Sequence, residues 1–227
     1  MPRIATREEF YDGDNPGKWA EEAERQLETY PPGKEEWSDR IPFPAWLDKY
    51  EVDRSGLVID FGCGTGLLRG IFKDMRYIGI DQNPAMLDGI EKRWAGKDNK
   101  MCAYESPLPE ITTHHPELKG VGDLGFFCTV LQHNHWTTAG EILHQAALVL
   151  KPGALLFMYE GTFTEKNYPK DVQEKYDLPE PDPERLECAD GPAIFTPKGW
   201  ANILDQQGFD YLEFDGDSSH VSRRRGA

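Results

Sequence analysis

The sequence has few basic residues relative to acidic ones, few cysteines and no long apolar segment. Only 25 lysines and arginines stand against 40 aspartates and glutamates among 227 residues, which gives a formal net charge of −15 at pH 7. This negative charge argues against a nucleic-acid groove or an anionic membrane surface as partner, although the run Arg223–Arg225 is locally basic. No apolar run approaches the roughly 20 residues that span a bilayer. We therefore expect neither a nucleic acid nor a membrane as partner.

The cysteines are too sparse to form a disulfide framework. Cys63, Cys102, Cys128 and Cys188 lie far apart and form no C-x-x-C pair. They also lack the cysteine and histidine spacing of a zinc site. The first ten residues are charged and contain no apolar signal-peptide stretch. These features predict unpaired thiols, no metal site and a soluble, cytoplasmic chain.

The length fits one core with a small appendage. We expect an N-terminal helical cap over residues 1–50 and an α/β domain over residues 51–227. Asn15-Pro16, followed by apolar residues at helical spacing, predicts a helix that ends before Pro31. A shorter helix is predicted after Pro44.

Aromatic residues gather at the start of this cap, namely Phe10, Tyr11 and Trp19. They have two interpretations that do not exclude each other. They pack the cap onto the rest of the fold, or they turn aromatic faces toward a cationic ligand.

Short apolar strands alternate with helices from Leu57 onward. Strands are predicted at Leu57–Phe61, Tyr77–Ile80, Asp123–Thr129 and Ala154–Tyr159, with a closing hairpin of Tyr211–Phe214 and His220–Arg223. Helices are predicted after Asn83-Pro84, at the capping box Thr138-x-x-Glu141, and from Thr196-Pro197 to Gly208. This alternation indicates a doubly wound α/β fold, in which helices cover both faces of a mainly parallel sheet.

Residues 161–195 interrupt the alternation with five prolines, many charges and few aliphatic side chains. The segment leaves a strand at its carboxyl end, which is where open α/β sheets bind ligands. We therefore expect it to form a lid or a substrate-binding insertion.

The strongest local pattern is Asp60-Phe61-Gly62-Cys63-Gly64-Thr65-Gly66, at the end of the first predicted strand. Alternate glycines permit a tight bend and let backbone N–H groups approach a ligand. Leu67 stands where a dinucleotide fingerprint requires its third glycine, so the spacing does not favour a pyrophosphate. Asp60 suits a ligand with an amino-acid tail, and Asp81, at the end of the next strand, can accept hydrogen bonds from ribose hydroxyls.

At these residues the chain resembles the class I S-adenosylmethionine-dependent methyltransferases. Asp60–Gly66 matches their first motif and Asp81–Leu87 looks like their second. The resemblance continues through Asp123–His133 and Leu148–Glu160, and covers about half of the chain. It implies a seven-stranded sheet of order 3-2-1-4-5-7-6, with the last strand antiparallel, and S-adenosyl-L-methionine as cofactor.

The resemblance also implies where this cofactor would lie. Its methionine tail would pass close to Gly62, Cys63, Gly64 and Gly66, with Asp60 near the amino group. Asp81 would bind the ribose, and Gln82 and Met86 would lie beside the adenine. Four residues at the exits of the third and fourth strands complete the set: Tyr104, Glu105, Cys128 and Thr129. Tyr104 and Glu105 stand where this family often has Asp-Ala, so recognition of the adenine edge by either stays open.

The exit of the fourth strand, Cys128–Trp136, is where this family places residues that face the acceptor. It lacks the Asn-Pro-Pro-Tyr-type tetrapeptide of amino-directed DNA methyltransferases and the paired glutamates of protein arginine methyltransferases. What remains resembles the group that methylates oxygen or nitrogen of small molecules. His133 is then the candidate general base, ahead of His135 and Glu160, or it only bonds a loop carbonyl. Tyr159, Glu160, Phe163 and Tyr168 would face the acceptor opposite His133.

Two other functions stay open at this point. One is a protein or nucleic-acid methyltransferase, which the charge and the missing motifs disfavour. The other is a non-catalytic protein that binds S-adenosylmethionine or S-adenosylhomocysteine as a sensor or partner subunit. His114-His115, before Pro116, predicts a solvated turn rather than a metal site. No pattern points to a particular oligomeric state.

Overall fold

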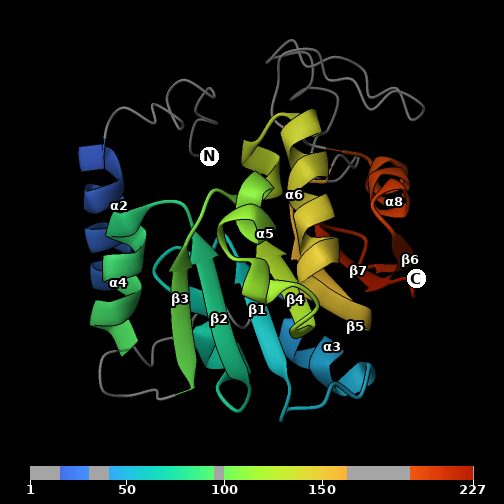
Figure 1. Ribbon diagram of the computed structural model, residues 1–227, viewed down its shortest axis with the longest axis horizontal. Helices are drawn as coiled ribbons and strands as arrows, with labels where there is room; N and C mark the ends of the chain where they lie inside the picture. The colour runs from blue at the N-terminus through green and yellow to red at the C-terminus, as the bar shows by residue number, and fades with distance from the viewer. Residues whose placement is uncertain (1–15, 31–40, 95–99, 163–194, 227) are drawn as a thin grey trace.

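The computed structural model describes residues 16–30, 41–94, 100–162 and 195–226, which form one sheet covered by helices (Figure 1). The strands are β1 (Leu57–Phe61), β2 (Arg76–Asp81), β3 (Met101–Glu105), β4 (Gly122–Cys128), β5 (Leu150–Tyr159), β6 (Phe209–Phe214) and β7 (Ser219–Arg224). Their order is β3-β2-β1-β4-β5-β7-β6. Strands β1 to β5 are parallel, whereas β7 is antiparallel to both β5 and β6. The predicted fold class and strand order are confirmed.

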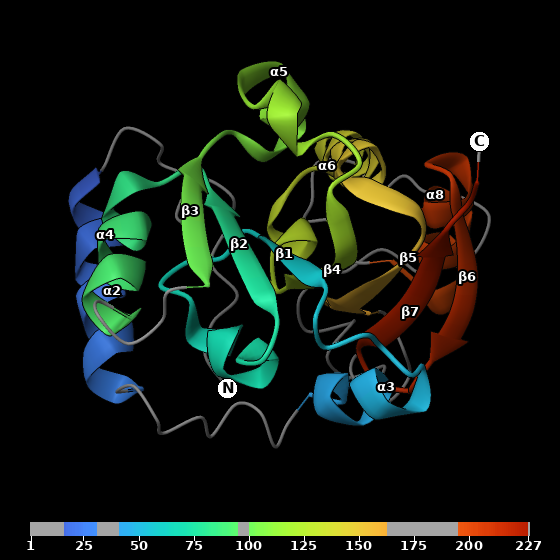
Figure 2. The ribbon, with the colours of Figure 1, turned by 60° about the horizontal axis from the view of Figure 1, so that its bottom comes forward.

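Helices lie on both faces of this sheet (Figure 2). The α-helices are α2 (Pro16–Thr29), α3 (Phe43–Lys49), α4 (Pro84–Trp94), α5 (Ile111–His114), α6 (Trp136–Val149) and α8 (Pro197–Gln206). Short 3-10 helices are η1 (Leu67–Phe72), η2 (Leu108–Glu110), η3 (Pro116–Leu118) and η4 (Leu131–His133). α5, α6 and α8 pack on one face, whereas α3, η1 and α4 pack on the other. α2 packs against α4.

The central strand β1 is buried on both faces, as expected for a parallel strand between helical layers. Ile59 and Phe61 belong to the core beneath α6 and α8, whereas Val58 belongs to the core beneath α3 and η1. Phe43 of α3 packs its ring against Phe126 of β4, with centroids 5.8 Å apart. α3 therefore contributes to the same core as the sheet, while the predicted division of the chain at residue 50 stays a prediction.

The glycine turn leads into the 3-10 helix η1, where the buried Arg69 guanidinium donates hydrogen bonds to the carbonyls of Phe72 and Met75. One predicted helix start differs in the structure. α6 begins at Trp136, so the capping box predicted at Thr138 is wrong. His135 caps this helix instead, and its side chain accepts a hydrogen bond from the Thr137 backbone N–H.

Several predictions fall outside the described residues. Phe10, Tyr11 and Cys188 lie there, and so does the predicted lid from residue 163 to 194, with Phe163 and Tyr168. Among the helices that the structure describes, none combines the length and apolar character needed to cross a membrane.

The strand register brings the ends of four strands to one edge. Phe61 of β1 is level with Ile80 of β2 and Phe127 of β4, and Cys128 is level with Tyr159 of β5. The chain proceeds outward from β1 to β2 and β3 on one side, and from β4 to β5 on the other. The crevice outside the carboxyl ends of β1 and β4 is thus a topological switch point, where open α/β sheets bind ligands.

Candidate cofactor and acceptor site

The three alternate glycines after β1 all have positive φ angles, +77° at Gly62, +52° at Gly64 and +69° at Gly66. A Cβ atom on Gly62 would lie 2.5 Å from Val130 Cγ2, and one on Gly66 would lie 2.5 Å from Ile90 Cγ1. A Cβ atom on Gly64 would come no closer than 3.8 Å to any atom of another described residue beyond its chain neighbours. Packing within the protein thus requires Gly62 and Gly66, whereas a Cβ atom on Gly64 would make only ordinary contacts with Gln26 Oε1 and Met86 Sδ.

Gly66→Ala is expected to destabilise the fold by about 2–5 kcal/mol, because left-handed strain adds to overpacking against Ile90. Gly120→Ala is the matched control, since Gly120 has φ +63° and no atom within 4 Å of its Cβ position. Urea denaturation measures both variants. Equal losses of stability would show that packing against Ile90 does not require glycine at position 66.

Asp81 joins the second motif to the glycine turn. Its Oδ2 accepts a hydrogen bond from the Gly64 N–H and its Oδ1 accepts one from the Asn83 N–H, each 2.9 Å long. Burial raises the pKa of the Asp81 carboxyl, and the N–H groups of Asn83, Gly64 and Gln82 oppose this rise. The structure therefore holds the half-buried carboxylate of Asp81 against the backbone of Gly64.

The other residues predicted around the adenine lie at the same edge. Met86 is buried, and its sulfur lies 4.0 Å from the Cβ position of Gly64. Gln82 is exposed. Asn83 Oδ1 accepts a hydrogen bond of 2.9 Å from the Ala85 N–H, which agrees with its predicted role as a cap of α4. At the end of β3, Glu105 is level with Asp81, and the ring of Tyr104 packs edge-on against His115.

Asp60 is enclosed beneath the turn, with a side chain only 3% exposed. The Tyr77 hydroxyl donates a hydrogen bond to its Oδ2. Burial raises the pKa of Asp60 to about 8, although the bond from Tyr77 acts in the opposite direction. Contact with a ligand ammonium therefore requires the second oxygen or a bridging water, and the assignment of Asp60 stays a prediction.

Cys63 packs toward β2. Its side chain is 6% exposed, and its sulfur lies 2.8 Å from the position that a Cβ atom on Gly79 would take. Burial raises the pKa of the Cys63 and Cys128 thiols well above the usual value. Both are free thiols that act as small apolar packing residues.

The turn after β4 lies against the glycine turn. Thr129 has φ +57°, a left-handed conformation that residues other than glycine rarely adopt. Val130 follows and fills the space that Gly62 leaves. His133 lies in η4, half-buried, and burial lowers the pKa of its imidazole. A neutral imidazole can accept a proton, so the geometry permits the predicted base role without testing it.

Three residues that the sequence did not single out tie α2 to the glycine turn. The Thr65 hydroxyl donates to Gln26 Oε1 over 3.0 Å. Arg93, 2% exposed, donates to the Thr65 carbonyl over 3.0 Å and to the Gln26 carbonyl over 3.2 Å. Gln26 thus comes within 3.8 Å of the Gly64 Cβ position. No local sequence signal reports such contacts, because they join segments that are 28–67 residues apart.

The paired histidines stand at the end of α5, where His115 lies beside the end of β3. His114 is exposed, and its Nε2 lies 3.0 Å from Glu110 Oε2. His115 Nε2 lies 3.0 Å from the Glu105 carbonyl oxygen. Within the described parts of the chain, no group of three or more His, Cys, Asp or Glu side chains is arranged to hold a metal ion.

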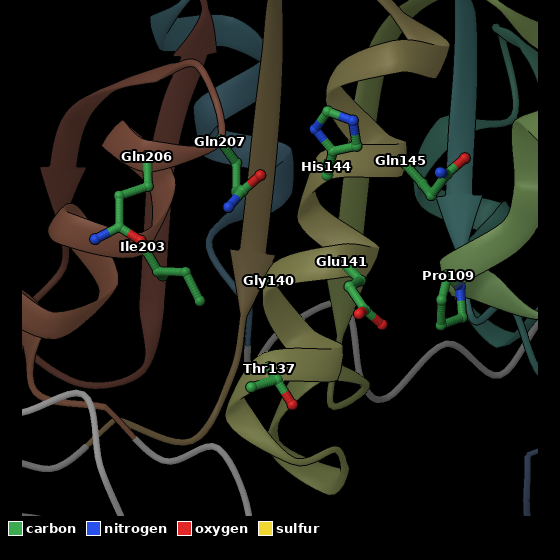
Figure 3. A pocket seen from close by; sticks show the side chains of 9 residues that line it. All are labelled: Pro109, Thr137, Gly140, Glu141, His144, Gln145, Ile203, Gln206 and Gln207. Atoms are coloured by element: carbon green, nitrogen blue, oxygen red, sulfur yellow. The ribbon is translucent and has the colours of Figure 1, made fainter.

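A groove of about 370 Å³ lies between α6 and α8 (Figure 3). Its lining includes Glu141 and His144 from α6 and Ile203, Gln206 and Gln207 from α8. None of the residues predicted for cofactor or acceptor lines it. The candidate site therefore rests on the glycine turn, Asp81 and the β4 exit, rather than on this groove.

The chain is similar to known methyltransferases in one segment of its sequence and in its fold. Residues 59–158 match the family described as "Methyltransferase domain". No curated protein sequence matches the chain. Solved structures with the same fold include the carbon methyltransferase CurJ, human N-acetylserotonin methyltransferase in complex with SAM, and magnesium protoporphyrin IX methyltransferase from Synechocystis PCC 6803 with bound SAH.

These three proteins are 16%, 15% and 19% identical to this chain, with TM-scores of 0.58, 0.65 and 0.57. They align with 79%, 100% and 80% of the chain, which in turn spans 51%, 61% and 80% of their lengths. The described residues therefore share the fold of these methyltransferases, and residues 59–158 match a methyltransferase domain.

Proposed function

We propose that the protein transfers the methyl group of S-adenosylmethionine to an oxygen or nitrogen atom of a small molecule. The observation that carries this proposal is the glycine turn after β1, where Asp81 accepts a hydrogen bond from the Gly64 N–H and Val130 of the β4 exit packs on Gly62. When bound there, the cofactor supplies a methyl carbon already activated by its sulfonium. The chain then has to orient the acceptor and exclude water, which are effective means of catalysis in such a displacement.

Individual residues are assigned to this cofactor as part of the proposal. The turn of Gly62, Cys63, Gly64 and Gly66 borders the methionine tail, and Asp60 lies near its amino group. Asp81 binds the ribose hydroxyls. The remaining assignments concern the adenine and the sulfonium: Gln82, Met86, Tyr104, Glu105, Cys128 and Thr129.

Three features support a small molecule as acceptor. The net charge of −15 disfavours nucleic acid. The acceptor motifs of DNA and protein-arginine methyltransferases are absent from Cys128–Trp136. N-acetylserotonin and magnesium protoporphyrin IX, which name two of the similar enzymes, are small molecules. A cytoplasmic location and action without a metal belong to the same proposal.

A methyl-transfer screen with labelled cofactor over pools of small molecules tests this function. Label on oxygen or nitrogen of a small product supports it. Label on carbon, as the description of CurJ would suggest, contradicts the assigned atoms while leaving the class intact. Cofactor binding without transfer to any pool favours a non-catalytic sensor or partner subunit. Label on protein or nucleic acid favours a protein or nucleic-acid methyltransferase.

His133→Gln is expected to lower the rate of methyl transfer about 10²- to 10⁴-fold if the imidazole removes the acceptor proton. Affinity for S-adenosylhomocysteine should change little. His144→Gln is the control, because His144 is exposed on α6 and lies in the separate groove. The rate is measured with the acceptor that the screen identifies, and an unchanged rate in His133→Gln would remove His133 from the catalytic step.

A further inference from the structure

The turn after β4, Thr129–Gln132, surrounds the side-chain carboxylate of Glu160. Glu160 follows β5, and its side chain is 1% exposed. Its Oε1 accepts a hydrogen bond of 2.9 Å from the Val130 N–H, and its Oε2 accepts one of 3.0 Å from the Gln132 N–H. Successive N–H groups that converge on one point form an anion-binding nest. Glu160 fills this nest from inside the protein.

A second contact closes the turn from the opposite direction. Gln132 Oε1 accepts a hydrogen bond from the Gly161 N–H. The turn Thr129–Gln132 and the pair Glu160–Gly161 are therefore linked in both directions. The side chain of Glu160 accepts from backbone N–H groups of the turn, and the side chain of Gln132 accepts from the backbone of Gly161. Glu160 itself is fixed, because its N–H donates to the Ser218 carbonyl over 2.9 Å.

The segment held in this way borders the candidate site. Thr129 keeps a left-handed conformation, which persists only where the surroundings enforce it. Val130 packs against Gly62 of the glycine turn. His133, the candidate base, follows in the same short helix as Gln132. Any loosening of the turn would therefore move groups on both the cofactor side and the acceptor side.

Glu160 does not itself act as the base for an acceptor. Both of its carboxylate oxygens are engaged by backbone N–H groups, and its side chain is buried. We infer that Glu160 is a positioning residue, which fixes the turn Thr129–Gln132 against the glycine turn in the geometry that methyl transfer uses. This inference rests on the proposed function, because it takes the crevice between β1 and β4 as the site of transfer.

A carboxylate suits this role better than an amide. Two oxygens accept from two N–H groups, whereas the side-chain NH₂ of a glutamine would face one of these donors. Glu160→Gln is therefore a near-isosteric change that removes one acceptor. Ser219→Ala is the matched control, because Ser219 is equally buried on the adjacent β7, and its hydroxyl has no hydrogen-bond partner among the described residues.

The first measurements use the full 227-residue chain. Hydrogen exchange should show the Val130 and Gln132 amides exchanging at least about tenfold faster in Glu160→Gln, with β4 and β5 amides unchanged. Calorimetry at pH 8 should show at least about fivefold weaker binding of S-adenosylhomocysteine than in wild type and Ser219→Ala. Both effects are expected because the turn loses one of its two anchors.

A pH profile separates positioning from a general loss of structure. Burial raises the pKa of Glu160 to about 7, and the N–H groups of Val130, Gln132 and Leu131 oppose this rise. Since those N–H groups favour the ionised form, wild-type affinity should rise as the pH increases from about 6 to 8. The permanently neutral Glu160→Gln should lack this component.

Other titratable groups on the neighbouring elements are identical in the two proteins, so the difference between the profiles isolates Glu160. These groups are Cys128 on β4, His133 in η4, and Asp215, Asp217 and His220 on the β6–β7 hairpin. The positioning role of Glu160 would be overturned if wild type and Glu160→Gln had parallel pH profiles of affinity. It would also be overturned if Glu160→Gln left amide exchange or the affinity for S-adenosylhomocysteine unchanged. None of these results would affect the proposed function. Failure of wild type to bind S-adenosylhomocysteine would overturn the proposed function as well.

Discussion

Gly64→Val is expected to weaken the binding of S-adenosylhomocysteine by at least about a hundredfold, equivalent to about 2.8 kcal/mol at 1.4 kcal/mol per factor of ten. The reason is spatial. Nothing in the described protein lies within 3.8 Å of the Cβ position of Gly64 apart from its own chain neighbours, so a valine side chain would extend into the space assigned to the cofactor. Isothermal titration calorimetry measures the change.

The control for this variant is Gly120→Val. Gly120 has φ +63°, close to the +52° of Gly64, and no atom lies within 4 Å of its Cβ position. Both variants carry the same left-handed strain, so their thermal stabilities should fall by similar amounts, while only Gly64→Val loses affinity. If Gly64→Val bound the ligand as wild type does, the glycine turn would be a structural feature without a ligand beside Gly64.

Asp81→Ala is expected to lower the affinity for S-adenosylhomocysteine at least about tenfold, since charge-assisted hydrogen bonds contribute about 1.5–3 kcal/mol each. Two causes act together. The ribose would lose its acceptor, and the Gly64 N–H would lose the carboxylate oxygen that holds it. Calorimetry of wild type and variant at one pH gives the ratio directly.

Asn83→Ala distinguishes loss of the ligand contact from loss of the local structure. Asn83 lies two residues from Asp81 and caps α4 through the Ala85 N–H. Its removal should cost about 1 kcal/mol of stability with little change in affinity. Equal affinity losses in Asp81→Ala and Asn83→Ala would show that Asp81 acts only by ordering this segment.

The sequence predicts the sheet well because its signals are local. β1 has the same bounds in prediction and structure, since five buried residues stand directly before a glycine turn. α8 begins after Thr196 as predicted, and the Thr196 hydroxyl accepts a hydrogen bond of 3.0 Å from the Gly199 N–H. In both cases the residues that decide the structure are adjacent in the chain.

The site is predicted less completely because its decisive contacts are distant in sequence. Glu160 reaches N–H groups 28 and 30 residues away, and Thr65 reaches Gln26 across 39 residues. A local pattern can also mislead. Thr138 and Glu141 have the spacing of a capping box, yet the imidazole of His135 caps α6 three residues before the expected cap.

The contact between Cys63 and Gly79 has a consequence for how related sequences diverge. A Cβ atom on Gly79 would lie 2.8 Å from the Cys63 sulfur and 3.0 Å from its Cβ atom, so the two positions share one limited volume. Their side-chain sizes should therefore vary inversely among homologues. An alanine at position 79 should accompany glycine at position 63, and the double exchange should restore stability that Gly79→Ala alone removes. The residue at position 63, between the first two glycines of the turn, would then vary together with position 79 of β2, whatever the ligand.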